Sequence, residues 1–415
     1  MNYTSFFEKA KNAAVDVSAM DKNMTADVLL NMADSFVGQT DFLLTENQKD
    51  LERMDPTDEK YDRLKLTAAR IRDIAAEIRN VAALKSPLGE MLLKKSMPNG
   101  MEISKIRVPL GVVAVIYEAR PNVTMDVFSL CFKTGNVALL KGSADAANSN
   151  KAIIGIIHSV LLKHQLNPDM AILLPTEREA TTALLNAVGY VDVVIPRGSQ
   201  NLINFVRQHS KIPVIETGAG IVHVFADESA DITKLSNIVF NSKTRRPSVC
   251  NSLDCLIVHH QLLPGLSAIL APLAEKQVEI FADAAAFTAL DGRYPASLLH
   301  QANDTHFGTE FLSLKMAIKT VVQFEDALKH IEKYSSKHSE AIVSENAAHI
   351  EMFLNSVDAA AVYANVATSF TDGAQFGLGA EIGISTQKLH ARGPMGLDEL
   401  TSYKWIVRGN GQVRP

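Results

Sequence analysis

Cysteine is scarce in this chain, and long apolar runs are missing. Three cysteines in 415 residues are too few and too unevenly spaced for a disulfide framework, so we expect a reducing compartment. No apolar run reaches the roughly 18 residues that a membrane helix requires. The N-terminal stretch MNYTSFFEKAKNAAVD is also not typical of a secretory signal. We therefore expect a soluble, cytoplasmic protein without a membrane partner.

An excess of positive charge is missing as well. The formal net charge is -5 and the pI is near 6.2, whereas a dedicated nucleic-acid binder usually carries a basic domain. We therefore expect no nucleic-acid partner. At 415 residues the chain is too long for one small core, so we expect two or three lobes.

The order of strands and helices predicts an α/β fold. Residues up to about 95 show helical spacing of apolar residues. From Leu110 onward, apolar strand candidates such as Gly111–Tyr117 and Ile212–Ile215 alternate with helical stretches, and a second series begins at Cys255–Val258. Such alternation is typical of a parallel sheet covered by helices on both faces. The dinucleotide fingerprint GxGxxG does not follow the first strand.

The stretch NSKTRRPSVCNSLD, residues 241–254, contains a candidate nucleophile. Cys250 lies there in a polar loop between a predicted helix and a predicted strand, with Lys243, Arg245 and Arg246 nearby in the sequence. Positive charge favours the thiolate, which is the nucleophilic form. The alternative is a buried structural cysteine, because free cysteines are among the most buried residues.

Other polar residues follow predicted strands, which is where open α/β sheets bind ligands. Asn122 could donate to an oxyanion or cap a helix, and Lys141 could contact a nucleotide or remain on the surface. Gly198 and Ser199 open a predicted helix whose N–H groups could bind a pyrophosphate. Glu216 precedes the segment TGAG and could be a general base or a turn residue.

Metal ligands at a typical spacing are missing. His330 and His338 are eight positions apart, and no third ligand stands at a zinc-like spacing, so we expect no metal site. We expect Cys131, in a predicted helix, and Cys255, at the start of a predicted strand, to pack in the core.

Taken together, these residues resemble the aldehyde dehydrogenase superfamily. The order Asn122, Lys141, Gly198-Ser199, Glu216-x-Gly-x-Gly, Cys250 and Glu310-Phe311 is similar to the order of functional elements in that superfamily. Within it, the chain is similar over essentially its whole length to the γ-glutamyl phosphate reductases. The segments that carry this similarity are YEARPNVT (117–124), RPSVCN (246–251), TEFLSL (309–314), ALKHIEKYSSKHSEAI (327–342) and HARGPMGL (390–397).

The resemblance implies a reaction. It is the NADPH-dependent reduction of L-glutamyl 5-phosphate to L-glutamate 5-semialdehyde and phosphate in proline biosynthesis, with glutamate 5-kinase as a functional neighbour. Cys250 would form a thioacyl-enzyme and Asn122 would stabilise the oxyanion, without a metal. The implied cofactor-binding residues are Lys141, Gly198, Ser199, Glu310 and Phe311.

The substrate of such an enzyme carries a phosphate and an α-carboxylate. Arg120, Arg246 and Arg392 are the candidates to bind these groups, because a guanidinium fork matches both oxyanions. The sequence leaves open which arginine meets which group. Glu216 resembles the base with which hydrolytic aldehyde dehydrogenases activate water. Since water would destroy the thioacyl group, we expect Glu216 to serve another role here.

The resemblance also implies two Rossmann-like α/β domains and a small β oligomerisation element. We expect a cofactor-binding domain at 1–225, a catalytic domain at 226–398 and an oligomerisation strand at 399–415. A hairpin at 97–108 would pair with that strand. Because an exposed sheet edge needs covering, a partner subunit is expected there, in a homodimer or a homotetramer.

Overall fold

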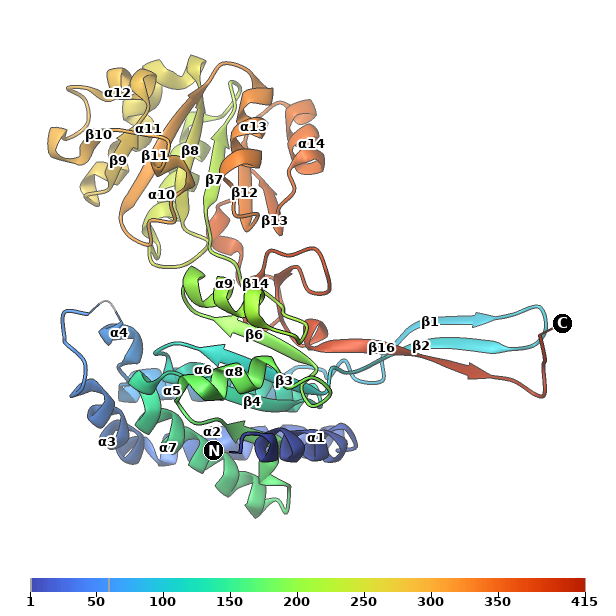
Figure 1. The fold of residues 1–415 in the computed structure, drawn as a ribbon. Coiled ribbons are helices and arrows are strands. Elements are labelled where there is room, and N and C mark those ends of the chain that lie inside the picture. Colours follow the sequence, from blue (N-terminus) through green and yellow to red (C-terminus); the bar gives the residue numbers. More distant parts are fainter. Residues whose placement is uncertain (1, 59, 415) are drawn as a thin grey trace. The chain divides into compact units, whose positions relative to one another are not determined.

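The computed structural model describes residues 2–58 and 60–414 and has the predicted α/β architecture, divided into two compact units (Figure 1). Unit 1 consists of Met1–Thr217, Gly377–Gly383 and Met395–Pro415, and unit 2 of Gly218–Phe376 and Ile384–Pro394. The predicted boundary at 225/226 falls inside a buried strand, because the chain enters unit 2 earlier, at Gly218. No helix among the described residues combines the length and the apolar character needed to cross a bilayer.

Unit 1 contains a four-stranded parallel sheet in the order β5-β4-β3-β6. Its strands are β3 (Val112–Tyr117), β4 (Val137–Gly142), β5 (Ala171–Leu173) and β6 (Val193–Arg197). Its helices are α1 (Thr4–Ser18), α2 (Lys22–Gly38), α3 (Thr40–Leu51), α4 (Tyr61–Leu64), α5 (Ala68–Ala83), α6 (Pro121–Lys133), α7 (Ala147–Lys163), α8 (Arg178–Leu185) and α9 (Gln200–His209). The strand predicted at Ile212–Ile215 is reduced to one parallel bridge between Val194 and Val214.

Every residue of β3 and β4 is buried, which explains why these strands are continuous apolar runs in the sequence. Helices α1 and α6 pack on β3 and β4, and α7 packs on β5. Helix α2 packs on α5, α6 and α7. The N-terminal helical region therefore covers this sheet and belongs to unit 1.

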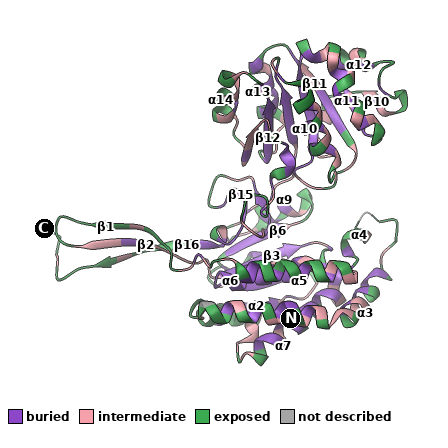
Figure 2. Cartoon of the chain, turned by 180° about the vertical axis from the view of Figure 1, so that it is seen from behind, coloured by how far each residue is buried: buried purple, intermediate pink, exposed green. Residues whose placement is uncertain are grey.

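A separate antiparallel sheet in unit 1 has the order β1-β2-β16. Its strands are β1 (Met91–Ser96), β2 (Glu102–Pro109) and β16 (Thr401–Arg408). The hairpin begins earlier than the predicted 97–108, and β2 pairs with the C-terminal strand along its whole length. Figure 1 shows this sheet as a long arm, and Figure 2 shows it largely exposed.

Unit 2 contains a seven-stranded parallel sheet in the order β10-β9-β11-β8-β7-β12-β13. The strands are β7 (Val222–Ala226), β8 (Leu253–His259), β9 (Glu279–Ala282), β10 (Leu299–Gln301), β11 (Lys315–Val321), β12 (Ser339–Val343) and β13 (Ala361–Ala364). The helices are α10 (Ile232–Thr244), α11 (Leu266–Glu275), α12 (Ala284–Leu290), α13 (Phe324–Tyr334) and α14 (Ala347–Ser356). Two further short strands, β14 (Ile384–Ser385) and β15 (Gly393–Pro394), pair with each other.

Alternating residues of the unit 2 strands build two hydrophobic cores. Leu256 and Val258 of β8 belong to the core that includes residues of α10, α11 and α12. Cys255 and Ile257 point to the opposite face and belong to the core that includes residues of α13 and α14. This alternation follows from the two-residue period of a strand. Cys255 is therefore a core residue, as predicted.

Several helices begin at a residue whose side chain accepts a backbone N–H. Asp231, Asp283 and Asn346 cap α10, α12 and α14 in this way, and Ser199 caps α9. Such caps satisfy donors that the first helical turn leaves unpaired. They fix where each helix starts relative to the strand before it.

Candidate active site

Cys250 lies in the loop between α10 and β8, partly exposed, and its backbone rests directly on Gly220. A Cβ added at position 220 would lie 1.6 Å from the Cys250 carbonyl oxygen and 2.6 Å from its Cα. No side chain fits in that space. The glycine of the TGAG segment is therefore required for the nucleophile loop to take this position.

Glu310 contacts the same glycine from another side. Its Oε1 accepts the Gly220 N–H at 2.8 Å, so Gly220 connects the acidic side chain to the loop of Cys250. The neighbouring Phe311 stacks on Phe281, with ring centroids 5.7 Å apart and nearly parallel planes. The structure thus brings Cys250, Glu310 and Phe311 together in unit 2.

Two buried ionisable residues, Asp254 and Lys243, support the segments that carry Phe311 and Cys250. The Asp254 carboxylate accepts the Phe311 N–H at 3.0 Å and the Val222 N–H at 3.4 Å. Lys243 Nζ is 4.0 Å from Asp254 and donates to the Leu253 carbonyl at 2.6 Å. Burial raises the pKa of Asp254 and lowers that of Lys243. Lys243 therefore supports the core, and Arg245 and Arg246 are the exposed cations of the loop.

Asn251, next to Cys250, anchors the loop on its other side. Its side-chain amide donates to the Thr371 carbonyl at 2.9 Å, and its own carbonyl accepts from the Thr368 hydroxyl at 2.8 Å. Residues on both sides of the nucleophile loop are thus fixed by hydrogen bonds or close packing. Such support limits the conformations available to the sulfur.

Arg392, the third arginine predicted to bind substrate, is partly buried and held by Asp358. Its Nη2 is 2.7 Å from Asp358 Oδ1, while Lys337 and Lys388 approach the other carboxylate oxygen. These hydrogen bonds, above all that from Arg392, hold the pKa of Asp358 well below its usual range. One carboxylate thus faces three cations, and the group keeps a net positive charge.

Asn122 lies in the first turn of α6, directly after Arg120, the exposed N-cap residue, and Pro121. Its side-chain amide donates one hydrogen to Asp126 Oδ2 at 2.9 Å. Burial, with a smaller contribution from Glu77, raises the pKa of Asp126 to about 7. Asn122 is therefore oriented by Asp126, a neighbour on its own helix. The side-chain amide of Asn122 has a second hydrogen, which it can donate to another acceptor.

Lys141 is the penultimate residue of β4 and is buried. Its Nζ donates to the carbonyls of Gly142 and Thr176 at 3.2 and 3.1 Å. Gly142, Thr176 and Glu177 line a cavity of about 520 Å³ together with residues of α1 and α7, including Lys151. That volume lies in the range of small-molecule sites. Lys141 itself shapes this cavity through the backbone.

Gly198 and Ser199 lie at the start of α9, but an acid already occupies the helix N-terminus. The Ser199 N–H and hydroxyl donate to the two carboxylate oxygens of Glu118 at 3.1 and 2.7 Å. A Cβ at Gly198 would lie 2.7 Å from the carboxyl carbon of Glu118. A phosphate at these N–H groups would therefore have to displace Glu118.

Glu216 lies two residues before the start of unit 2 and pairs with Arg207 of α9 at 3.4 Å. An arginine partner stabilises the carboxylate and occupies one of its oxygens. The role of Glu216 stays a prediction.

Sequence reasoning missed several residues that hold these groups in place, namely Glu118, Asp126, Asp254 and Asp358. Glu118 directly follows β3 and Asp126 lies one turn along α6, and both positions could have been noticed. Their partners, however, lie as much as 81 positions away in the sequence, as for Glu118 and Ser199. Of the predicted residues, those in unit 1 are Arg120, Asn122, Lys141, Gly198 and Ser199.

Comparisons with known proteins agree on one family. The aldehyde dehydrogenase family matches residues 2–283. A γ-glutamyl phosphate reductase of Pelodictyon phaeoclathratiforme is 58% identical, with 98% of this chain and 97% of the relative covered. One of Bacteroides thetaiotaomicron is 57% identical, with 100% and 99% covered. The crystal structure of the Thermotoga maritima γ-glutamyl phosphate reductase matches with a TM-score of 0.95 at 36% identity, and both chains are covered fully.

Proposed function

The chain belongs to the aldehyde dehydrogenase family and, within it, to the γ-glutamyl phosphate reductases, and on that premise we propose that it reduces L-glutamyl 5-phosphate to L-glutamate 5-semialdehyde with NADPH in proline biosynthesis. The observation that carries the proposal is the support of Cys250 by Gly220, beside the carboxylate of Glu310. This contact holds the loop of the Cys250 thiol next to Glu310 and Phe311, the two residues predicted to hold the cofactor.

The first step uses Cys250 as the nucleophile. Its thiolate attacks the carbonyl carbon of the acyl phosphate, and the bond from carbon to the phosphate oxygen breaks, so that phosphate leaves with the electron pair. A thioacyl group remains on Cys250. Arg245 and Arg246, both exposed on the same loop, favour the thiolate before the attack.

Asn122 is proposed to stabilise the oxyanion. One hydrogen of its amide is held by Asp126, so the side chain needs little reorganisation when charge develops on the substrate oxygen. Donors of this kind contribute about 10²–10³-fold to kcat.

The family uses nicotinamide cofactors, and the cavity beside β4 and α7 is a suitable place for the adenosine half. It is of the right size, and Lys151 adds a cation that suits a phosphate. Lys141 would position this half through the backbone of the cavity, and Gly198 and Ser199 would contact it once Glu118 leaves the N-terminus of α9. Glu310 and Phe311 would hold the nicotinamide half. When bound, the reduced cofactor supplies the hydride that converts the thioacyl group to the aldehyde. Cys250 then leaves as the thiolate.

Arg120, Arg246 and Arg392 are proposed to bind the phosphate and the α-carboxylate. Arg120 and Arg246 are exposed, and Arg392 belongs to a group with excess positive charge. Glu216, paired with Arg207, is proposed not to activate water, which preserves the thioacyl group for reduction. The acyl phosphate would come from a kinase acting on glutamate, such as glutamate 5-kinase.

The β1-β2-β16 sheet is proposed to join subunits in a homodimer or a homotetramer. Tyr403, Trp405 and Val407 alternate along β16 and are each more than half exposed. Such an apolar row on an edge strand is normally covered by a partner.

The test is oxidation of L-glutamate 5-semialdehyde, followed as NADPH formation with and without inorganic phosphate. We expect activity that requires phosphate and is absent in Cys250→Ala. Phosphate-independent turnover would instead indicate a hydrolytic enzyme, and a requirement for coenzyme A would indicate a different acyl acceptor. Either result would overturn the proposal.

A further inference from the structure

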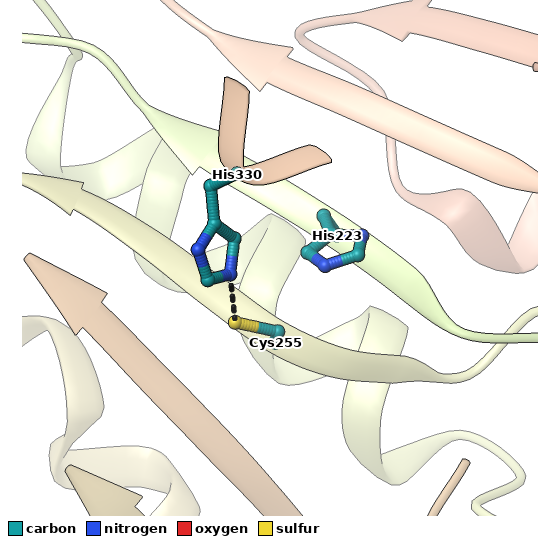
Figure 3. A group of neighbouring side chains, drawn as sticks. All are labelled: His223, Cys255 and His330. Atoms are coloured by element: carbon teal, nitrogen blue, oxygen red, sulfur yellow. Dashed lines mark hydrogen bonds between the residues drawn. The ribbon is translucent and has the colours of Figure 1, made fainter. Parts of the chain in front are cut away.

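Two histidines and a cysteine form a buried cluster in unit 2 that the proposed reaction does not use (Figure 3). His223 of β7 and Cys255 of β8 are register partners on neighbouring parallel strands, and His330 comes from α13. Exposed fractions are 0% for His223 and Cys255 and 8% for His330. One potential ligand atom from each residue lies within 4.8 Å of the other two.

The distances within the cluster fit a metal ion. Cys255 Sγ is 3.7 Å from His330 Nε2. Zinc bonds of about 2.3 Å to sulfur and about 2.0–2.1 Å to nitrogen, at tetrahedral to trigonal angles, place such a pair roughly 3.5–3.8 Å apart. The His223 and His330 rings are nearly perpendicular, with centroids 5.6 Å apart. Zinc binding would bring the three ligand atoms, which lie within 4.8 Å of one another, to the closer spacing of a coordinated set.

His223 is already oriented as a ligand. Its Nδ1 donates to Glu340 Oε2 at 3.0 Å, and Glu340 also accepts the His223 backbone N–H and the Ser335 hydroxyl. Because Nδ1 carries the proton, Nε2 carries the lone pair, and Figure 3 shows one ring nitrogen turned toward Cys255. A carboxylate behind a histidine in this manner is the usual support of a metal ligand.

The Nε2 of His223 has no hydrogen-bond partner among the residues that the structure describes, although it is fully buried. Buried polar atoms are nearly always paired, so an orphaned lone pair directed at a thiol and a second imidazole requires an explanation. A bound cation provides that partner.

We propose that His223, Cys255 and His330 form a binding site for a zinc ion. A thiolate and two imidazoles suit zinc, which is a borderline-soft cation. The thiolate and the Glu340 carboxylate together balance its double charge, whereas monovalent copper would leave an excess negative charge in this core. Binding forms the sulfur–zinc bond and releases the thiol proton to solvent. Three protein ligands leave the fourth tetrahedral position to water.

The site lies directly behind the candidate active site and goes beyond the proposed reaction. Gly220 comes two residues before β7, and Cys250 comes three residues before β8. Ser336, just after α13, accepts the Ile221 N–H at 2.8 Å. Zinc would therefore link the three elements whose ends support the nucleophile loop.

The experiment measures zinc binding by the full-length protein, which is prepared without a metal-affinity column, stripped of metal with a chelator and then incubated with Zn²⁺. We expect one equivalent of Zn²⁺ to remain after desalting, and one equivalent of Co²⁺ to give a sulfur-to-cobalt charge-transfer band. Cys255→Ala and His330→Gln should each weaken Zn²⁺ binding at least tenfold, and the charge-transfer band should vanish in Cys255→Ala. Zinc should also raise the Tm of the wild type but not of these variants.

Two variants serve as matched controls. Cys131 is equally buried, and His338 is a buried histidine that also has an orphaned Nε2, but neither belongs to the cluster. Cys131→Ala and His338→Gln should retain one zinc. A metal-free Tm of Cys255→Ala within a few degrees of the wild type shows that the variant is folded. Zinc retained equally by Cys255→Ala, retention of copper(I) but not zinc, or no metal bound by the wild type would overturn the proposal.

Discussion

The Cys250 carbonyl oxygen lies where the Cβ of any side chain at position 220 would stand, at a separation of 1.6 Å. The same Gly220 donates its N–H to Glu310 at 2.8 Å. One glycine therefore sets the position of the nucleophile loop and of the acid predicted to hold the cofactor. The tolerance of this position to substitution is a direct probe of the site.

Gly220→Ala should reduce kcat by on the order of 10²-fold, because displacing the loop by about 1 Å moves the sulfur out of its attacking position. Gly265→Ala is the matched control, since a Cβ there meets nothing within 4 Å. Steady-state kinetics of both variants check this prediction. Equal activity of the two variants would show that the contact is unimportant.

Arg392→Met should raise the KM for either the semialdehyde or phosphate at least tenfold, and the substrate affected identifies the oxyanion that Arg392 binds. Asp358→Asn removes the partner of Arg392 but keeps the arginine, so both KM values should stay within about twofold. Both variants should lose a few degrees in Tm, because each breaks the 2.7 Å pair. Unchanged KM values in Arg392→Met would assign it a structural role only.

His338 makes stability depend on pH. Burial lowers its pKa from 6.5 to about 4, so between these values the unfolded chain binds more protons than the folded one. Stability is therefore lost as the pH falls from 6.5 toward 4, by roughly 3 kcal/mol for this group. Urea unfolding at several pH values should show a flatter acid limb for His338→Gln than for the wild type. Identical slopes would refute the assignment.

Val407→Glu should dissociate the oligomer, because it places a charge in the exposed apolar row of β16. Val188→Glu is the matched control, since Val188 is 60% exposed and Val407 58%, but Val188 lies outside this sheet. Light scattering after size-exclusion chromatography measures the mass of each variant. A monomeric wild type, or an intact oligomer of Val407→Glu, would refute the proposed role of this sheet.

The fold was predictable because buried parallel strands such as β3 and β4 are continuous apolar runs. β7 was not recognised, because His223 interrupts its apolar run near the start of the strand. The edge strand β10 (LHQ) and its neighbour β9 (EIFA) were not recognised either, because polar residues interrupt these short stretches. Because β7 was not recognised as a strand, the predicted boundary at 225/226 falls inside it and differs from the start of unit 2 at Gly218.

Within the site, Cys250 could be found from its polar, basic loop. Its support could not, because the contact with Gly220 joins residues 30 positions apart and that of Gly220 with Glu310 joins residues 90 positions apart. The same holds for the metal ligands. In the sequence, the nearest histidine with which His330 could be paired was His338. The structure instead groups His330 with His223, 107 positions away, and with Cys255, 75 positions away.

The most direct test of the account is the first turnover in the absence of phosphate. With NADP and L-glutamate 5-semialdehyde, the wild type should form NADPH in a burst equal to the concentration of Cys250 and then stop. Intact-protein mass spectrometry should then find one glutamyl group on that residue, and added phosphate should start steady turnover. Steady NADPH formation without phosphate, or the same burst in Cys250→Ala, would contradict the central claim.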